Sequence, residues 1–365
     1  MVIYYIVRDM KLLYLIPLLI FLSSCAAEPE KESIISIELI DFEEINLSSE
    51  KHFFEEVINA SSMTLQGDKI LISEYHNVPD EFPRIHIINT SDWTYDKPKG
   101  RFGQGPREIN IPEFIVSQDS DNFWVYDYNN RKISTFSFND STLLASSDRK
   151  ITDPNLGPMR LILTPSGNYL GVPRENENKI LEFDPEGNLI DAYGEFEVPE
   201  ERPDLPKLQV SLLNNGRFHG NQNNGIYVRA SMYRDLMEIF NYKTKKFISV
   251  IGPDLKLPEF EYHDSKFGGM ISFEPDVPKK YQDIAVSERY IFVLYSGYSH
   301  LDYVNSGLSA QEIRVFDLKG KPKWRFALDR SVSQISINEK NNKIYGLTTD
   351  EDPGIAVFKI PDELL

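Results

Sequence analysis

The chain has 365 residues, of which 41% are hydrophobic and 26% are charged, so it can bury a sizeable core and is not a disordered chain. It carries 56 acidic against 39 basic side chains, a formal net charge of -17. Because a nucleic-acid backbone is held by clustered lysines and arginines, this balance disfavours a nucleic-acid partner.

The N-terminal segment predicts export. Residues 11–22 read KLLYLIPLLIFL, a basic residue followed by an apolar run shorter than the roughly 20 residues that span a bilayer. We therefore expect a signal peptide over residues 1–24, with Met10 as an alternative start. The run ends in Leu22-Ser23-Ser24-Cys25, which resembles the lipobox of bacterial lipoproteins.

Cys25 is the only cysteine of the chain, so an intrachain disulfide is impossible and acylation gives the thiol a role. The alternative is an ordinary secretory cleavage site with an incidental cysteine. Residues 25–33 form a short acidic tether, so we expect acyl chains at Cys25 to hold the protein to the membrane without a basic patch. The expected location is the bacterial cell envelope, at the outer membrane, on its periplasmic or its surface face.

The remaining body, residues 34–365, is predicted to be all-β. Its apolar residues alternate or form short β-branched and aromatic runs bounded by Gly, Asn, Asp and Pro. A unit of four strands recurs in six copies of about 55 residues each, which favours a six-bladed β-propeller of four-stranded antiparallel blades. An open sandwich or a solenoid is the alternative. The copies begin at Ser62, Phe114, Arg160, Gly216, Asp283 and Ser333.

The last copy stops after its third strand, at the sequence GIAVFKI. We expect the N-terminal strand to complete it, with Ile34 to Phe42 pairing against Gly354 to Ile360. This pairing would close the ring and remove an exposed sheet edge.

Two segments carry a family resemblance: the turn Gly103-Gln104-Gly105-Pro106-Arg107-Glu108 between two copies, and the sequence VFDLKG at 315–320. They resemble the TolB-like six-bladed β-propeller lipoproteins, whose blades are related to NHL repeats. The resemblance spans essentially the whole mature chain. It implies a binding or scaffold role in the envelope, with an envelope protein, a small molecule or a glycan as partner, and no assigned reaction.

Signatures of catalysis are missing, because the chain has neither a G-x-S-x-G nucleophile elbow nor an H-E-x-x-H zinc helix. No cofactor, metal site or catalytic residue is predicted. Two alternatives stay open. A metal-dependent lactonase or esterase would hold a divalent cation with a Glu, an Asn and an Asp at the axis. That triad is not recognisable, although Asp127, Asn221 and Asp350 lie near suitable strand ends, where Asp and Asn are also common turn residues. A structural subunit of an envelope complex would show a broad apolar patch.

The long loops are expected to share one face of the propeller, where binding usually resides. Arginines recur in them, and a guanidinium suits a carboxylate, phosphate or sulfate. We predict an anionic or sugar-like ligand over the axis, held by Arg101, Arg174 and Arg229, with residues 296–311 as a movable cover. Pairing of these arginines with the many Asp and Glu residues is the alternative. The full candidate set is Arg84, Arg101, Arg131, Arg174, Arg229, Arg234, Tyr233, Tyr298 and Tyr303.

Overall fold

The computed structural model describes residues 33–364 except 118, 155, 158, 159, 174, 266 and 267. The predicted signal peptide, the lipidated Cys25 and nearly all of the tether lie outside the described residues. Within the described part of the chain, no helix is both long and apolar enough to cross a membrane.

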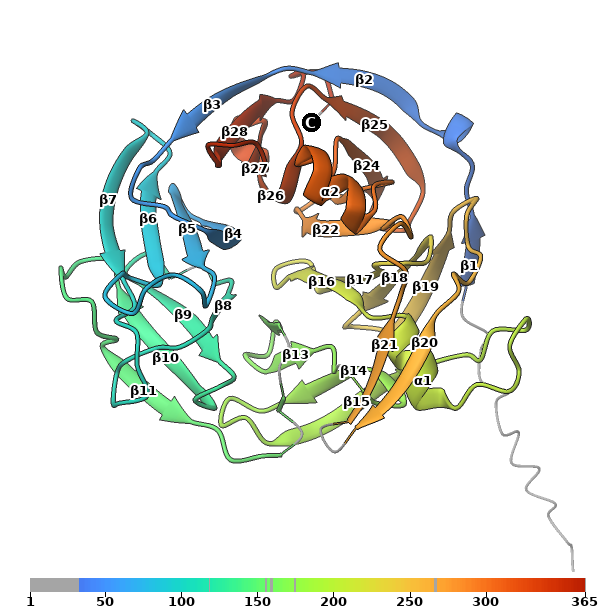
Figure 1. The fold of residues 1–365 in the computed structure, drawn as a ribbon, viewed down its shortest axis with the longest axis horizontal. Coiled ribbons are helices and arrows are strands. Elements are labelled where there is room, and N and C mark those ends of the chain that lie inside the picture. Colours follow the sequence, from blue (N-terminus) through green and yellow to red (C-terminus); the bar gives the residue numbers. More distant parts are fainter. Residues whose placement is uncertain are drawn as a thin grey trace, which may run out of the picture. The chain divides into compact units, whose positions relative to one another are not determined.

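The described body consists of six four-stranded antiparallel blades arranged in a ring, as predicted (Figure 1). Blade 1 contains β4 (Ala60–Gln66), β5 (Lys69–Glu74), β6 (Ile85–Asn89) and β7 (Thr94–Lys99). Blade 2 contains β8 (Pro112–Ile115), β9 (Asn122–Asp127), β10 (Lys132–Ser137) and β11 (Ser147–Lys150). Blade 3 contains β12 (Leu161–Leu163), β13 (Tyr169–Gly171), β14 (Asn178–Phe183) and β15 (Leu189–Glu195).

The second half of the ring repeats this pattern. Blade 4 contains β16 (Gly216–Asn221), β17 (Ile226–Ser231), β18 (Leu236–Asn241) and β19 (Lys246–Ile251). Blade 5 contains β22 (Tyr281–Val286), β23 (Tyr290–Tyr295), β24 (Glu312–Asp317) and β25 (Pro322–Leu328). Blade 6 contains β26 (Val332–Asn338), β27 (Lys343–Thr348) and β28 (Gly354–Lys359), with a short 3-10 helix at Glu339–Asn341.

The core is divided among the blade interfaces. One cluster of buried apolar side chains lies between each pair of neighbouring blades, including the pair formed by blades 6 and 1. A central strand is therefore covered on both faces, which explains the continuous buried runs in β17 and β22. Around the axis, the first strands of neighbouring blades contact one another in the order β8, β12, β16, β22, β26 and β4.

The ring is closed by an N-terminal strand, but the predicted segment is wrong. The strand that pairs antiparallel with β28 is β3 (Ser49–Phe53). The preceding residues run along the outside of the ring, where β1 (Ser33–Ser36) adds parallel to β19 and β2 (Glu43–Leu47) adds parallel to β25. An outermost strand faces solvent on its edge and carries many polar residues. The polar sequence SEKHF of β3 therefore suits the closing position better than the more apolar segment at 34–42.

The turn that resembles the family pattern connects blades 1 and 2. Glu108 accepts a hydrogen bond from the Gly105 backbone N–H at 3.0 Å, and a Cβ added at Gly103 would lie 2.0 Å from the Glu108 carboxylate. Asn130 also donates to the Gly103 carbonyl at 3.0 Å. A side chain at Gly103 would displace the Glu108 carboxylate from this hydrogen bond, so the motif has a structural explanation.

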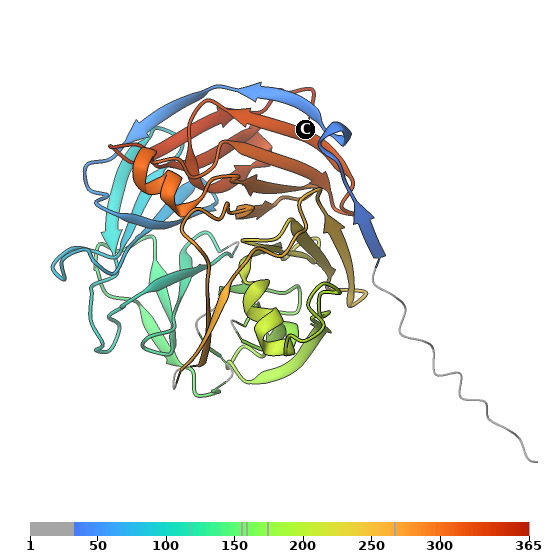
Figure 2. The same ribbon diagram turned by 45° about the vertical axis from the view of Figure 1, so that its right-hand side comes forward.

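Three insertions extend from the loops. Helix α1 (Lys207–Leu213) joins blades 3 and 4, the hairpin β20 (Glu261–Ser265) with β21 (Gly268–Ser272) joins blades 4 and 5, and α2 (His300–Ser306) lies between β23 and β24. Figure 2 shows α1 beside the hairpin, and the two share an apolar cluster that contains Val210 and Ile271. The remaining 3-10 helix, Leu39–Asp41, lies between β1 and β2.

Candidate functional site

The largest cavity described here lies where the N-terminal ends of the inner strands meet. Its volume is about 540 Å³, within the range of roughly 300–1,000 Å³ that is usual for small-molecule sites. Its lining comes from the starts of the inner strands and from loops of blades 5, 6 and 1. We call this space the axial cavity.

The lining of the axial cavity is mostly polar. It contains eight Ser and Thr residues and three tyrosines, but the aliphatic lining is limited to Ala60, Leu308, Leu347 and Pro353. Small-molecule sites are usually lined by hydrophobic side chains. This composition therefore favours a ligand that is itself rich in polar groups.

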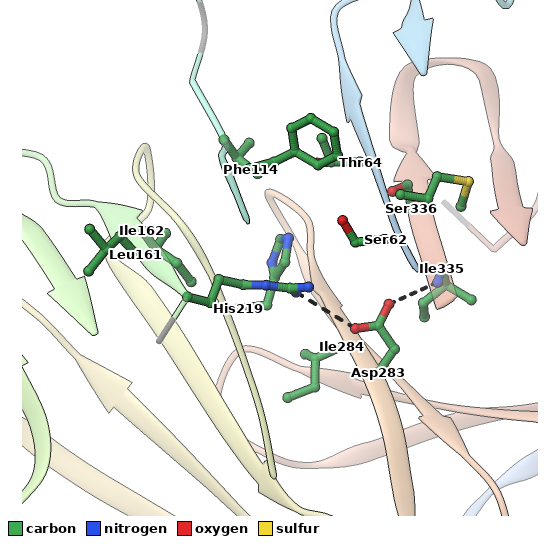
Figure 3. Close-up of a pocket in the computed structure, with 13 residues that line it drawn as sticks. Ser62, Thr64, Phe114, Leu161, Ile162, His219, Asp283, Ile284, Ile335 and Ser336 are labelled. Carbon is green, nitrogen blue, oxygen red and sulfur yellow. Dashed lines mark hydrogen bonds and ion pairs between the residues drawn. The ribbon is translucent and has the colours of Figure 1, made fainter. Parts of the chain in front are cut away.

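Below the axial cavity, side chains of the inner strands fill the channel along the axis. The space that remains has a volume of about 20 Å³, enough for about one water molecule. Figure 3 shows Phe114, His219 and Asp283 around it, with Asp283 accepting a hydrogen bond from the Ile335 backbone N–H at 2.9 Å. A ligand of more than a few atoms must therefore enter and leave through the axial cavity.

Three cationic side chains line the axial cavity: Arg160, which directly precedes β12, Arg217 in β16, and Lys279, which lies just before β22. The Arg160 guanidinium lies 3.8 Å from Asp283 and 4.0 Å from Glu113, so two carboxylates compensate it from a distance. Their spacing is too long for close hydrogen bonds.

Arg217 and Lys279 are compensated less. Arg217 Nε donates to the Gln282 carbonyl at 2.6 Å, which fixes the guanidinium and leaves its terminal nitrogens without a partner among the described residues. The Lys279 backbone N–H donates to Tyr298 O at 2.9 Å. Its ammonium has no ion pair or hydrogen bond with the described part of the chain. Both cations thus keep donors available to a ligand.

The pKa shifts agree with this picture. Burial lowers the pKa of Lys279, and the neighbouring positive charge of Arg217 lowers it further. Burial also lowers the pKa of Arg217, which Asp283 partly offsets, and burial raises the pKa of Asp283 itself. Burial lowers the pKa of His219 to about 3, so this imidazole is neutral at physiological pH. A bound anion would stabilise the two crowded cations.

The arginines predicted from the sequence lie elsewhere. Arg174 falls outside the described residues, and the other predicted arginines do not line the axial cavity. Arg101 is exposed and lies 3.5 Å from Glu108, whereas Arg131 donates to the Asp153 carbonyl on the surface. Neither faces a ligand-sized cavity described here.

The other three arginines are buried and have structural partners. Arg84 donates to the Val78 carbonyl at 2.9 Å, Arg229 pairs with Glu238, and Arg234 donates to Asn214 Oδ1 at 3.1 Å. Several members of the predicted set thus pair with carboxylates, which is the alternative stated above. Their role in ligand binding remains an untested prediction.

Of the three tyrosines predicted from the sequence, one packs against another part of the protein and two line the axial cavity. Tyr233 stacks on Phe273 with ring centroids 3.9 Å apart, so its ring packs against the insertion between blades 4 and 5. Tyr298 and Tyr303 both line the axial cavity, and Tyr298 also donates to Gln311 Oε1 at 3.0 Å. The predicted cover at residues 296–311 therefore does border the site.

The sequence prediction missed Arg160, Arg217 and Lys279, although a signal was present. Each lies within two residues of the first residue of an inner strand. Equivalent positions in a propeller converge on the axis. An alignment of the copies would have brought these cations together.

The residues considered for a metal site do not converge. Asp127 accepts from the Asn110 backbone N–H at 2.7 Å, and Asp350 is paired with Lys51 at 2.9 Å. Asn221 lies in β16, at the end remote from the axial cavity. Among the residues with a described placement, no group of three or more His, Cys, Asp or Glu is arranged to hold a metal ion.

Six four-stranded blades around a polar axial cavity define the class as a six-bladed β-propeller. The chain belongs to the TolB-like family: the model described as "TolB-like 6-blade propeller-like" matches residues 47–340. The sequence resemblance noted above is thereby confirmed. No curated protein matches the chain at a significant level.

Solved structures match the chain at low sequence identity. An exported protein of Bacteroides fragilis NCTC 9343 is 13% identical, with a TM-score of 0.53, and the match covers 89% of this chain and 99% of that one. A streptogramin B lyase is 13% identical over 87% of this chain and 98% of that chain, with a TM-score of 0.46. A luciferin-regenerating enzyme is 8% identical over 86% and 96%, with a TM-score of 0.48. At 13% identity and a TM-score of 0.53, the Bacteroides protein is related to this chain by fold alone.

Proposed function

We propose that this protein is a lipid-anchored propeller of the bacterial cell envelope that binds an anionic small ligand in its axial cavity. One observation carries the binding role: Arg160, Arg217 and Lys279 come from three different blades and meet in the same cavity. The terminal nitrogens of Arg217 and the ammonium of Lys279 have no partner there among the described residues.

The negative net charge of the protein strengthens the case that these three cations bind an anion. A chain of net charge -17 repels anions at long range, so it does not collect them by its overall field. Cations that remain partly desolvated without close carboxylate partners are costly to keep. An anionic ligand would offset that cost, and the paired donors of a guanidinium would orient it.

Native purification tests the binding role. Small molecules released by denaturing the protein from its own membranes should include anions, identified by mass spectrometry. In the double variant Arg217→Gln with Lys279→Gln, we expect the released anions to fall at least tenfold, because both available donors are lost.

The matched control is Arg289→Gln. Arg289 lies in the turn between β22 and β23, is half exposed, and pairs with Glu339 at 2.7 Å. It does not line the axial cavity. This control should release the same anions as the wild type. Equal release from the double variant, or wild-type protein that releases no enriched anion, would contradict the proposed function.

The lipid anchor is tested at Cys25. We expect a labelled fatty acid to enter the wild type and to be absent from Cys25→Ala, because the lone thiol is the attachment point of the acyl chains. The wild type should sediment with membranes and the variant should not. Wild-type protein that is recovered soluble, unlabelled and cleaved after Ser24 would show that the segment is an ordinary signal peptide.

A further inference from the structure

In three neighbouring blades, the innermost strand has a shift in its pairing register near its N-terminal end. The register shifts between Tyr281 and Asp283 in β22, between Val332 and Gln334 in β26, and between Ala60 and Ser62 in β4. The extra residues are Gln282, Ser333 and Ser61, and all three line the axial cavity.

The opposite three blades differ. The innermost pairing of blades 2, 3 and 4 runs without a register shift. A bulge leaves one residue outside the regular ladder and redirects its side chain, and bulges are frequent beside binding sites. Their repetition in blades 5, 6 and 1 therefore marks one wall of the axial cavity, which we call the bulged wall.

Gln282 provides an independent sign that the bulged wall receives a ligand. Its side chain is only 9% exposed, yet Oε1 has no hydrogen-bond partner in the described structure. A buried acceptor without a donor is unfavourable, so such groups are usually satisfied by water or a ligand. The Gln282 carbonyl also holds Arg217, so the unpaired oxygen and the anion-binding guanidinium are neighbours.

The bulged wall and the opposite side of the axial cavity, formed by blades 2 to 4, suit different chemical groups of one ligand. Glu113, Arg160 and Arg217 come from blades 2 to 4 and are charged, whereas the bulge residues Ser61, Gln282 and Ser333 are neutral. Blades 5 and 6 add the charged residues Lys279 and Asp350, and Asp350 is paired with Lys51. A ligand that fits both needs an anionic group on one side and neutral hydrogen-bonding groups on the other. Hydroxyls satisfy the second requirement because each can both donate to and accept from the serine hydroxyls and the Gln282 carboxamide.

We propose that the axial cavity binds an acidic saccharide, with its carboxylate toward Arg217 and Lys279 and its hydroxyls toward Gln282, Ser333 and Ser61. This inference rests on the proposed function and narrows its ligand class. Tyr75 and Tyr303 line the same cavity, and each is 47% exposed, which leaves ring faces free to pack on a sugar. The sparse aliphatic lining offers little to an acyl chain or to the apolar side chains of a peptide.

The test compares three probes by titration calorimetry with the purified wild-type protein. They are a galacturonic acid trisaccharide, its neutral methyl ester, and tricarballylate, which carries three carboxylates and no hydroxyl. We expect the acidic trisaccharide to bind at least tenfold more tightly than either of the others. Gln282→Met keeps the side-chain length but removes the acceptor, so it should weaken trisaccharide binding about tenfold and leave tricarballylate binding unchanged.

Gln222→Met is the matched control, because Gln222 lies in the turn after β16 and does not line the axial cavity. It should bind all three probes like the wild type, and thermal melting should show that both variants are folded. Ser333→Ala provides a second, smaller loss of trisaccharide affinity. Equal affinity for the trisaccharide and tricarballylate, or an unchanged Gln282→Met, would overturn the saccharide inference and leave the anion site standing. Failure of both anions to bind would overturn both proposals.

Discussion

Removal of residues 33–53 should leave no stably folded monomer, whereas removal of residues 33–42 should leave a folded propeller with a lower melting temperature. In both variants residues 1–32 are joined directly to the rest of the chain. The longer deletion removes β3, the only strand that pairs with β28 on its open side in the described structure. Blade 6 would then expose a sheet edge, and the long-range contacts that close the ring would be lost.

The shorter deletion removes β1 but keeps β3. It exposes apolar surface that Ile37 and Phe42 cover in the cluster between blades 4 and 5. Each buried side chain of this kind contributes about 1.5–3 kcal/mol, so the propeller should melt several degrees lower and remain cooperative. Circular dichroism melts and size-exclusion chromatography distinguish the two outcomes. A longer deletion that melts like the shorter one would show that β3 does not close the ring.

Much of the fold could be predicted because its signals are local. The six predicted copies begin at residues that all lie in, or directly before, the first strand of a blade. Short β-branched strands separated by polar turns are recognisable within a window of about ten residues. Counting such units is sufficient to give the number of blades.

The closing strand was predicted wrongly, because the polarity of β3 is the one local difference between it and the segment at 34–42. The segment at 34–42 and β3 both precede the first copy, and both can form strands. The choice depends on how far the chain runs around the outside of the ring before it meets blade 6. Two additional parallel pairings, to β19 and β25, take up the first part of that path.

The cations available at the candidate site could not be predicted from the sequence, because their partners depend on how the strands pair. Arg229 resembles a ligand-binding arginine in the sequence, but it lies directly opposite Glu238 on the neighbouring strand and is neutralised there. Arg217 shows no such cross-strand carboxylate, since it faces Ala230. Only the strand register reveals which arginine is already paired and which remains available.

Glu238→Gln should destabilise the protein by about 3–5 kcal/mol, the second large effect that we expect. Glu238 is buried, pairs with Arg229 and lies 2.8 Å from Lys179. Arg229 is held further by the Asn214 carbonyl at 2.6 Å and lies over the Phe196 ring, so it cannot turn to solvent without breaking these contacts. The substitution keeps the shape of the side chain but removes the negative charge that compensates Arg229 in this buried site.

The stability that Glu238 contributes should also depend on pH. Burial alone would raise the pKa of Glu238, but the charges of Arg229 and Lys179 outweigh burial and hold this pKa below its ordinary value of 4.5. A depressed pKa in the folded state stabilises the protein above the unfolded value, and this contribution is lost as pH falls through the folded value. The difference in unfolding free energy between wild type and Glu238→Gln should therefore be greatest above pH 4.5 and shrink below it.

Urea denaturation at pH 7 and at a series of lower pH values measures both effects. The matched control is Glu195→Gln, which makes the same chemical change in an exposed pair with Lys207. Solvent screens that pair, so the control should unfold like the wild type at every pH. If Glu238→Gln also unfolded like the wild type at pH 7, Arg229 would have another compensating partner.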